Sequence, residues 1–434
     1  MLWIVLMVAS GATCGSALAA WPISAGAGTT AVTIPTYAVS VVAFGANGNG
    51  VSDNTRAFNA AIAAVQQSGG GTVTVPPGTY AFTSAASQDC LPSVVIPPGP
   101  PVRMLGSNRS TTRLVEHVSD KCLLAVFADN SRVAQLTLDS ESHHGGPALT
   151  VRASYTIVRD DIVLGQNFTG PLVHGLGGTF AIFYEGKPGS TVQHPLYEVG
   201  NLVRNIIVHD GVDNDGFSFS FQNDARIKNV QHTGSRLALY IDSGVTVINY
   251  SYTPNAACLN AEDGFWITAP SEHIIIDGFT SKGAGGIVSG IANPYVSTDI
   301  SISGERLLNP GYSLVAANVA GLTVTSVDLS AGGTLSIEPP DAASGIVVSD
   351  SIIPHVNFNS WGNAAYTSAS ATFNNDTFPA YDDANGKPTP TFNRGNKSGA
   401  TRVTINLGVW SNAIGGFSGG QPISFTVSNL KGYN

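Results

Sequence analysis

The stretch FGANGNGVSDNTRAFNAAIAAVQQSGGGTVTVPPGTY, residues Phe44 to Tyr80, combines three local patterns. A glycine-rich turn comes first, and in the run that follows Phe58, Ile62 and Val65 fall on one face of a helix. Three glycines end this run, and GTVTV then has the alternation that is typical of a strand. The stretch therefore predicts a turn, an amphipathic helix and a strand.

The composition favours short strands over helices. Charged residues make up 11% of the 434 residues, whereas an average domain has roughly 25%, and there are 49 glycines. Strands joined by glycine and asparagine turns suit this composition better than helices rich in Glu and Lys. The net charge of −9 comes without runs of Lys or Arg, so nucleic acid is not an expected partner.

Short strands with alternating apolar residues recur along the chain at a regular interval. Their marker residues, spaced by 20, 29, 26, 22 and 24 residues, are Ala225, Val245, Ile274, Ile300, Leu322 and Ile346. The interval from Val133 to Tyr155, 22 residues, extends the repeat to the earlier chain. Because this spacing leaves too little room for crossover helices, it predicts an all-β parallel β-helix, a solenoid of stacked coils.

The first coil of such a solenoid needs a cover over its core and its unpaired strand edges. The helical run suits this role, with Asp53 or Asn54 as its cap. We therefore expect residues 41–80 to form an N-terminal capping helix and the first coil. Residues 165–200 interrupt the rhythm and are expected to form long loops, and residues 361–434 are expected to form an irregular C-terminal part.

Residues 41–80 contain NGVSDNTRAFNAAI followed by GGGTVTVPPGTY. This stretch resembles the pattern DGVxDxTxAFxxAI and GGGTVxVPPGTY at the start of the pectate-lyase-like, or rhamnogalacturonase/epimerase-like, superfamily. Asn49 stands where that superfamily often has Asp. The resemblance implies a right-handed parallel β-helix for residues 21–434 as a single domain. It leaves the reaction open, because hydrolases, lyases, epimerases and phage tailspikes have similar openings.

The N-terminal residues 1–20 have the pattern of a signal peptide. An apolar core from Leu2 to Ala9 precedes the small-residue segment ALAA, where we expect cleavage near Ala19 or Ala20, although the usual Lys or Arg at the start is missing. A buried N-terminal strand is the alternative. No segment has the length of a membrane span, so we expect a secreted or periplasmic protein.

Three cysteines follow the predicted signal peptide, at positions 90, 122 and 258. An odd number in an exported chain allows one disulfide at most, for which we predict Cys90 and Cys122.

Three segments of the middle coils contain the candidate catalytic residues, HDGVDNDGFSFS from His209, GSRLALYIDSG from Gly234 and NAEDGFWITAP from Asn260. Asp215, Arg236 and the pair Glu262/Asp263 are separated by 21 and 27 residues, so a solenoid can stack them on one face. Hydrolysis of a glycosidic bond needs a protonated carboxyl group and an ionised one, and Asp213 adds to this stock.

These segments, with GAGGIVSG further on, resemble the series of acidic pieces on successive coils of polygalacturonases. The resemblance matches Asp215 to the first aspartate of that series and Glu262 with Asp263 to its acidic pair. Asp213 replaces an Asn of the family, Ala284 stands where the family has its His, and 48 residues separate Asp215 from Asp263, about two coils. The resemblance thus implies a hydrolase of an acidic plant or microbial polysaccharide.

Two other functions fit the same residues. Arg236 can be the base of a lyase that acts by β-elimination on a uronate polymer, with the carboxylates gathered around Ca²⁺. A non-catalytic β-helix that binds glycans at a surface is the second alternative, because aspartates before glycine also serve as turn residues. No cofactor is expected for the hydrolase, no metal-ligand spacing is found, and the oligomeric state stays open.

Further residues near the acidic segments are candidates for contact with the substrate. Tyr240 and Trp266 can stack against sugar rings. Lys282 can pair with a uronate carboxylate, and His209 and His232 flank the acidic residues. Asp213 completes this set of predicted substrate-binding residues.

Overall fold

The computed structural model divides the chain into two compact units, residues 1–33 and 34–434, and the second contains the fold. The predicted signal peptide, residues 1–20, lies outside the described residues. The structure describes residues 33–84, 92–118, 122–140, 146–165, 180–191, 194–209, 215–234, 237–242, 244–254, 263–267, 271–282, 286–288, 296–308, 313–316, 319–331, 333–337, 343–358, 368–379, 392–394, 400–410, 423–427 and 430–432.

Two large parallel sheets, A and B, and one small sheet contain the described strands. Sheet A consists of β1 (Ala38–Ser40), β2 (Asn49–Asp53), β3 (Gly71–Val75), β4 (Gly78–Phe82), β6 (Val102–Gly106), β7 (Thr112–Glu116), β9 (Arg132–Ala134), β10 (Thr137–Asp139), β12 (Ile157–Arg159), β13 (Ile162–Leu164), β16 (Leu202–His209), β19 (Ala225–Thr233), β21 (Val245–Thr253), β23 (Glu272–Ser281), β25 (Ser297–Ser303), β26 (Arg306–Leu307), β28 (Val319–Thr325), β30 (Ala343–Ser349), β32 (Ser368–Phe378), β34 (Ala400–Trp410), β35 (Ile423–Val427) and β36 (Leu430–Gly432).

Sheet B consists of β5 (Val94–Ile96), β8 (Leu124–Val126), β11 (Leu149–Val151), β14 (Phe180–Tyr184), β17 (Asp215–Phe219), β20 (Leu237–Ile241), β22 (Asp263–Ile267), β24 (Gly286–Val288), β27 (Ser313–Ala316), β29 (Thr334–Ile337), β31 (His355–Phe358) and β33 (Phe392–Arg394). The small sheet pairs β15 (Glu198–Val199) with β18 (Gln222–Asn223).

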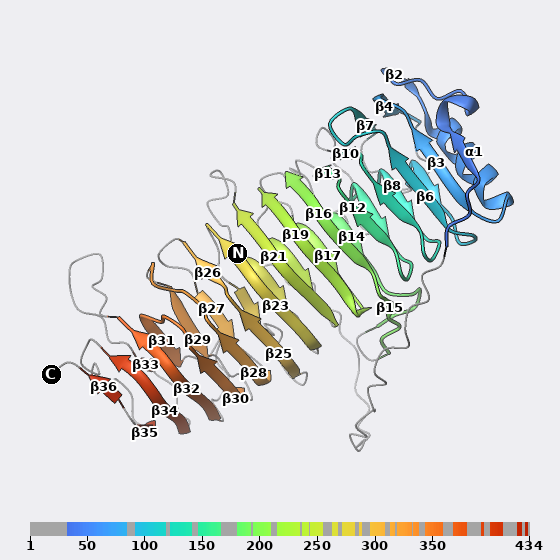
Figure 1. Ribbon diagram of the computed structural model, residues 1–434. Helices are drawn as coiled ribbons and strands as arrows, with labels where there is room; N and C mark the ends of the chain where they lie inside the picture. Colours follow the sequence, from blue (N-terminus) through green and yellow to red (C-terminus); the bar gives the residue numbers. More distant parts are fainter. Residues whose placement is uncertain are drawn as a thin grey trace. The chain divides into compact units, whose positions relative to one another are not determined.

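The chain alternates between sheets A and B, and each sheet B strand pairs with the one from the next coil (Figure 1). This arrangement confirms the predicted right-handed parallel β-helix. The marker residues of the repeat lie side by side: Ala225 pairs with Val245, and Ile300 pairs with both Ile274 and Leu322. The earlier spacing was wrong, because Val133 pairs with Val158 and not with Tyr155, which lies in a turn with φ of 57°.

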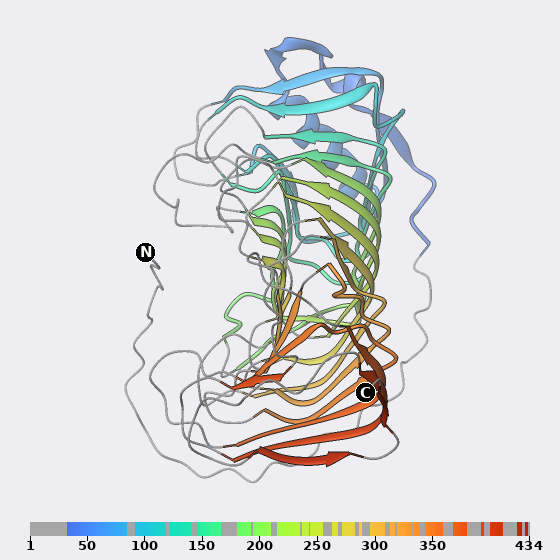
Figure 2. The same ribbon diagram turned by 90° about the vertical axis from the view of Figure 1, so that its left-hand side faces the viewer.

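The N-terminal helix α1 (Thr55–Gln67) covers the first coils, as predicted (Figure 2). Phe58, Ile62 and Val65 are buried, and the Phe58 ring lies 5.4 Å from that of Tyr80 in an edge-on arrangement. The Asp53 carboxylate accepts hydrogen bonds from Thr55 at the start of the helix, whereas the Asn54 side chain makes no capping bond. A short 3₁₀ helix, η1 (Val41–Phe44), precedes these elements.

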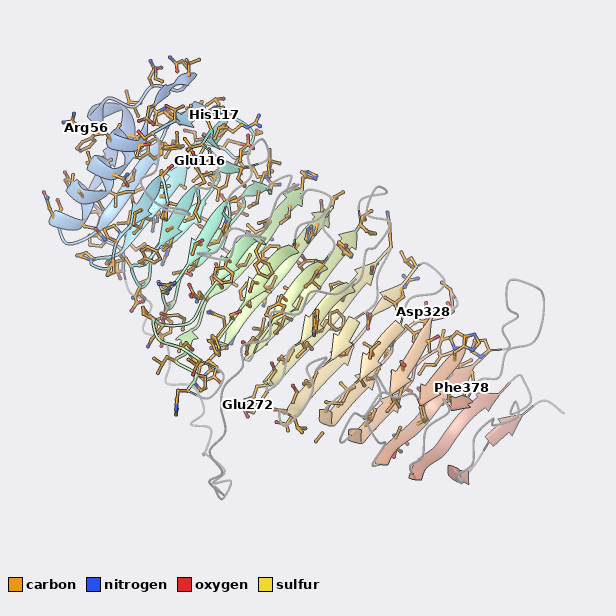
Figure 3. The ribbon with its side chains drawn as sticks, turned by 180° about the vertical axis from the view of Figure 1, so that it is seen from behind. Arg56, Glu116, His117, Glu272, Asp328 and Phe378 are labelled. Atoms are coloured by element: carbon orange, nitrogen blue, oxygen red, sulfur yellow. The ribbon has the colours of Figure 1, made fainter. Side chains whose placement is uncertain are left out.

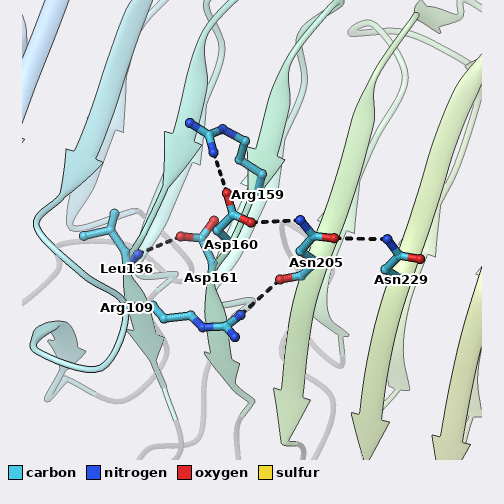
Figure 4. Close-up of polar contacts among 7 residues, drawn as sticks. All are labelled: Arg109, Leu136, Arg159, Asp160, Asp161, Asn205 and Asn229. Atoms are coloured by element: carbon cyan, nitrogen blue, oxygen red, sulfur yellow. Dashed lines mark hydrogen bonds and ion pairs between the residues drawn. The ribbon is translucent and has the colours of Figure 1, made fainter.

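A ladder of exposed polar side chains runs along one corner of the coils of sheet A (Figure 4). Asn205 donates to Asp160 at 2.9 Å, Asn229 to Asn205 at 3.1 Å, and Asn249 to Asn229 at 2.9 Å. All four residues have φ between 54° and 59°, a conformation that Asn and Asp tolerate better than other residues with a side chain. The recurring Asn and Asp of the sequence repeat therefore have a definite role, which is to turn each coil at this corner.

Two regions are more regular than the sequence rhythm predicts. Phe180–Tyr184 lies within the predicted loop region 165–200, yet it forms β14, which pairs with β11 and β17 in sheet B. In the C-terminal part, β32 and β34 continue sheet A, and Phe373 and Phe378 of β32 are buried (Figure 3). Tertiary pairing with the neighbouring coil fixes these strands where local sequence signals are weak.

Cys122 is buried and forms a disulfide, while the predicted partner Cys90 lies outside the described residues. The peptide N–H of Ser93 donates to the carbonyl oxygen of Cys122 at 3.0 Å, so the chain after position 90 runs beside Cys122. Of the helices that the structure describes, none has the length and apolar character that crossing a membrane would require.

Candidate functional site

The predicted catalytic residues belong to consecutive turns that lead from sheet A to sheet B. The turns connect β16 to β17, β19 to β20, β21 to β22 and β23 to β24. Asp213, Arg236 and Glu262 fall within them and lie outside the described residues. Asp215 and Asp263 begin the strands that follow the first and third turns, and their side chains are likewise outside the described part.

The strand register aligns Asp215 with Asp263. Asp215 pairs with Leu237, and Leu237 pairs with Asp263. Two interstrand spacings separate the two Cα atoms, which amounts to roughly 10 Å. The interval of 48 residues thus corresponds to two coils, and Arg236, next to Leu237 in sequence, belongs to the coil between them.

Packing inside the coil explains why glycine follows Asp215. A Cβ atom at Gly216 would lie 1.9 Å from Cε1 of His232 and 2.6 Å from the carbonyl oxygen of Ala238. His232 is 2% exposed, and its Nδ1 lies 2.7 Å from the hydroxyl oxygen of Tyr250. The Asp-Gly pair in this segment therefore reflects packing against a buried histidine as well as any chemistry of the aspartate.

The placement of His232 does not fit its predicted contact with substrate. Burial, and to a smaller extent the nearby His209, lowers the pKa of His232 to about 3, so the imidazole is neutral at physiological pH. By contrast, His209 and Lys282 are exposed at the ends of β16 and β23, where sheet A leads into the turns. These two side chains remain available to a ligand at this edge.

Tyr240 and Trp266 lie next to each other on the outer face of sheet B. They are paired in the β20–β22 register, both are half-buried, and their ring centroids are 6.4 Å apart. Trp266 lies between the buried residues Phe265 and Ile267, as alternation along the strand requires. The indole Nε1 of Trp266 is buried and has no hydrogen-bond partner in the described part of the chain.

Two phenylalanines that the sequence analysis missed extend this pair. Phe183 pairs with Ser218, which pairs with Tyr240, and the Phe180 ring lies 5.7 Å from that of Phe183 and 6.0 Å from that of Tyr240. Both phenylalanines are half-buried. We call Phe180, Phe183, Tyr240 and Trp266 the aromatic row. The run of apolar and aromatic residues FAIFY could have indicated a strand here, but the residues fell in a region predicted to be loops.

The aromatic row and the two aspartate positions lie on four neighbouring strands of sheet B, β14, β17, β20 and β22, and β22 carries both Asp263 and Trp266. Phe180 pairs with Asp215, so the row begins at the register position of the aspartates, and Trp266 follows Asp263 by three residues along β22. Half-exposed rings beside carboxylate positions and turn residues form a surface on which a chain of sugar rings can lie.

The residues that could hold a metal ion lie mainly outside the described part of the chain. Among the residues that the structure describes, no group of three or more His, Cys, Asp and Glu side chains lies close enough to hold a metal ion. The carboxylates of Asp215, Glu262 and Asp263 would be the ligands of a Ca²⁺ ion in a lyase, and they stay candidates for that role.

The comparison with protein families supports the resemblance at the N-terminus. Residues 38–90 match the family model described as rhamnogalacturonase A/epimerase, pectate lyase-like. This match covers the turn, α1 and the first coils, and it confirms the resemblance that the sequence motif indicates. No curated protein is similar enough in sequence to match the chain.

Solved structures with a similar chain path include three proteins with different activities. The A-module of the Azotobacter vinelandii mannuronan C-5 epimerase AlgE6 is 17% identical, with 91% of this chain and 99% of that chain covered and a TM-score of 0.49. The catalytic unit of the GH87 α-1,3-glucanase of Streptomyces thermodiastaticus is also 17% identical, with 94% and 70% covered and a TM-score of 0.44. The Thermotoga maritima exopolygalacturonase is 12% identical, with 91% and 92% covered and a TM-score of 0.44.

Proposed function

We propose that this protein is an exported enzyme that hydrolyses glycosidic bonds of an acidic polysaccharide. The observation that carries the proposal is the common register position of Asp215 and Asp263 on sheet B, with Tyr240 and Trp266 three residues further along neighbouring strands. Carboxylates beside an exposed platform of rings suit the chemistry of glycoside hydrolysis. The family model matched at the N-terminus, which names a rhamnogalacturonase, agrees with a carbohydrate substrate.

We include direct displacement by water in the proposal, because the Cα separation of the two aspartates leaves room for it. Inverting glycosidases hold their carboxyl groups ~6.5–9.5 Å apart, and retaining enzymes ~5–5.5 Å apart. Cα atoms that lie two strands apart, at roughly 10 Å, leave room for a water molecule between a general acid and a general base. In this proposal Asp215 and the Glu262/Asp263 pair supply the acid, the base and the group that holds the water, with individual roles unassigned.

The remaining residues bind and orient the substrate. Tyr240 and Trp266 offer ring faces to the sugars, and Lys282 and His209, exposed at the entrance to the same turns, can contact carboxylates or hydroxyl groups. Arg236 lies in the turn between those of Asp213 and Glu262, where its guanidinium can hold a uronate carboxylate.

The test is a screen of the purified protein on pectic, alginate and bacterial exopolysaccharides that follows reducing ends and ultraviolet absorbance together. Hydrolysis produces new reducing ends without absorbance, whereas elimination leaves an unsaturated sugar that absorbs. Rising absorbance would replace the proposal by the lyase with Arg236 as base. Turnover that is lost in Asp215→Asn and Asp263→Asn but kept in Asp224→Asn, an exposed control outside the turns, would support the proposed roles.

The aromatic row also fits a protein that only binds glycans, and the same variants separate the two functions. A binding protein would show no turnover on any substrate, and Asp215→Asn would leave its affinity for the polysaccharide unchanged. An enzyme would lose turnover in this variant and keep its fold, which circular dichroism would verify.

A further inference from the structure

The outer face of sheet A carries a concentration of cationic side chains on five neighbouring strands, β6, β9, β12, β16 and β19. The residues next to these cationic residues on each strand are buried, so alternation directs the cationic side chains outward. Examples are Met104, Val133, Val203 and Ile227. We call this set the cationic stripe, and its members are Arg103, Arg132, Arg159, Arg204, Arg226 and Lys228.

The strand register places the members of the stripe beside one another. Arg103 pairs with Arg132 on the next coil. Arg159, Arg204 and Lys228 occupy one register position on three successive coils. The Cα atoms of neighbours are therefore ~4.8 Å apart, the spacing of adjacent strands. This repeat is close to the length of one sugar unit along an extended chain.

Two carboxylates of the described residues interact with the stripe: Asp160 interacts with both Arg159 and Arg204, and Asp224 interacts with Arg226. Arg159 forms an ion pair with Asp160, and Arg226 forms one with Asp224 at 3.1 Å. The other four members make no ion pair with any residue that the structure describes. A chain with a net charge of −9 and only 20 Lys and Arg residues has thus gathered unpaired cations on one face.

The cations of the stripe lie close enough to affect the pKa of one another. Burial lowers the pKa of Arg132, and the charges of Arg103 and Arg159 lower it further. Like charges at this distance repel one another and weaken the fold slightly, unless an anion lies among them. A planar guanidinium also suits the paired oxygens of a carboxylate.

A polar pocket of about 460 Å³ adjoins the stripe at the corner of the coils. Asp160 and Asn205, which follow Arg159 and Arg204 directly in sequence, line it together with Gln135, Asn108 and Arg109. Arg109 reaches across from the turn between β6 and β7 and donates to the carbonyl oxygen of Asn205 at 3.2 Å (Figure 4). Amide and guanidinium groups are the partners that sugar hydroxyl and carboxylate groups need.

We propose that the cationic stripe and the adjoining pocket bind a chain of an acidic polysaccharide, as a second site apart from the turns that carry the candidate catalytic residues. The identification of the ligand as a polysaccharide rests on the proposed function. Arg204 precedes His209 by five residues along β16, at most ~16 Å, and the chain turns at Asn205 between them. The stripe can therefore hold a polymer chain while another part of the polymer occupies the turns.

A nucleic acid is the less suitable polyanion. Proteins that bind single strands combine cationic grooves with aromatic side chains on which bases stack, and the five strands of the stripe contain no Phe, Tyr or Trp. The pocket beside it is lined by amide side chains, Ser107, Arg109 and the carboxylate of Asp160, groups that match sugar hydroxyl groups better than base faces.

The test measures binding of polygalacturonate to the full-length mature protein by isothermal titration calorimetry at low and high salt, with dextran as a neutral polymer. The stripe variant is Arg204→Gln/Lys228→Gln, which removes two cations without ion pairs. The control is Arg56→Gln/Lys187→Gln, which removes two exposed cations away from the stripe, Arg56 on α1 (Figure 3) and Lys187 near the small sheet. Both variants change the net charge equally.

We expect the stripe variant to weaken polygalacturonate binding roughly ten-fold at low salt and the control to leave it unchanged, since exposed ion pairs contribute a few-fold each. The effect should shrink at high salt, because salt screens exposed charges. Equal affinity of stripe variant and wild type, or equal loss in both variants, would overturn the inference.

Two further outcomes are informative. An oligonucleotide that binds the stripe more tightly than polygalacturonate would overturn the assignment to a polysaccharide. Because binding is measured without turnover, a protein that degrades no polymer but shows the expected ten-fold loss would refute the proposed enzyme and support the stripe.

Discussion

Glu305 offers a direct test of how the core of the coils sets the pH dependence of stability. The side chain is fully buried, and neither carboxyl oxygen has a hydrogen-bond partner in the described structure. It lies level with Phe279 and Val327, the buried residues of the neighbouring coils. Burial raises the pKa of Glu305 from 4.5 to about 8, so the folded protein holds it as the neutral acid at physiological pH.

The sign and size of the effect follow from this shift. Because the folded-state pKa lies above the unfolded-state value, the folded protein binds more protons between the two, and stability falls as pH rises through this window. A shift from 4.5 to about 8 corresponds to roughly 5 kcal/mol over the whole window at 1.36 kcal/mol per pH unit, and to about 3 kcal/mol by pH 7. Asp161, raised to about 8, and Asp376, raised to about 7, add to the same trend.

Glu305→Leu should stabilise the protein because it replaces an unsatisfied acid by an apolar side chain of similar size. We expect a gain of about 1–3 kcal/mol near pH 5 that grows by up to about 3 kcal/mol toward pH 7, measured by urea unfolding at several pH values. Glu305→Gln should flatten the pH profile to the same extent without the gain at low pH, since the amide is also unsatisfied. A wild-type pH slope in both variants would refute the reasoning and show that Glu305 titrates with an ordinary pKa.

Three further predictions concern the coils around the candidate site. Gly216→Ala should lower the free energy of unfolding by about 1–3 kcal/mol, and His232→Ala should relieve part of this loss in a double-mutant cycle; independent effects of the two substitutions would contradict the packing described. Asn229→Ala should cost about 1–2 kcal/mol more than Asn229→Gly in urea unfolding, because both lose the ladder bonds but only Ala is strained at a φ of 54°; equal losses would argue against strain at this corner. Tyr240→Ala and Trp266→Ala should each raise KM roughly ten-fold with little change in kcat, as expected for lost contacts with bound sugar; a fall in kcat alone would assign these rings a role in the transition state.

The sequence was most informative where one chemical pattern has one structural outcome. The face formed by Phe58, Ile62 and Val65 can only be buried against something apolar, and it packs on the first coils as predicted. The spacing of the apolar markers could be translated into coils because each coil must bury the same column of residues, and Ile300 indeed pairs with the markers on both sides.

For the candidate site, the sequence determined the residue types and the approximate coil of each. It placed Asp215 and Asp263 about two coils apart, and the register through Leu237 has this separation. The sequence could not show that His232 points into the core, since alternation does not reveal which face of a strand is the inner one at a bend. It also could not join Phe180 to Tyr240, which are 60 positions apart in the chain.

The cationic stripe could not be recognised from the sequence and became visible only in the tertiary structure. Its six members are scattered over more than a hundred residues, and no segment of the sequence is a basic run. Their proximity arises only when parallel pairing brings equivalent positions of successive coils to ~4.8 Å from each other. The sequence by itself determined the solenoid, because local periodicity and turn chemistry repeat in every coil. The tertiary structure decided which side chains share a face, because that depends on register and on the bends of each coil, which are set by contacts between segments distant in sequence.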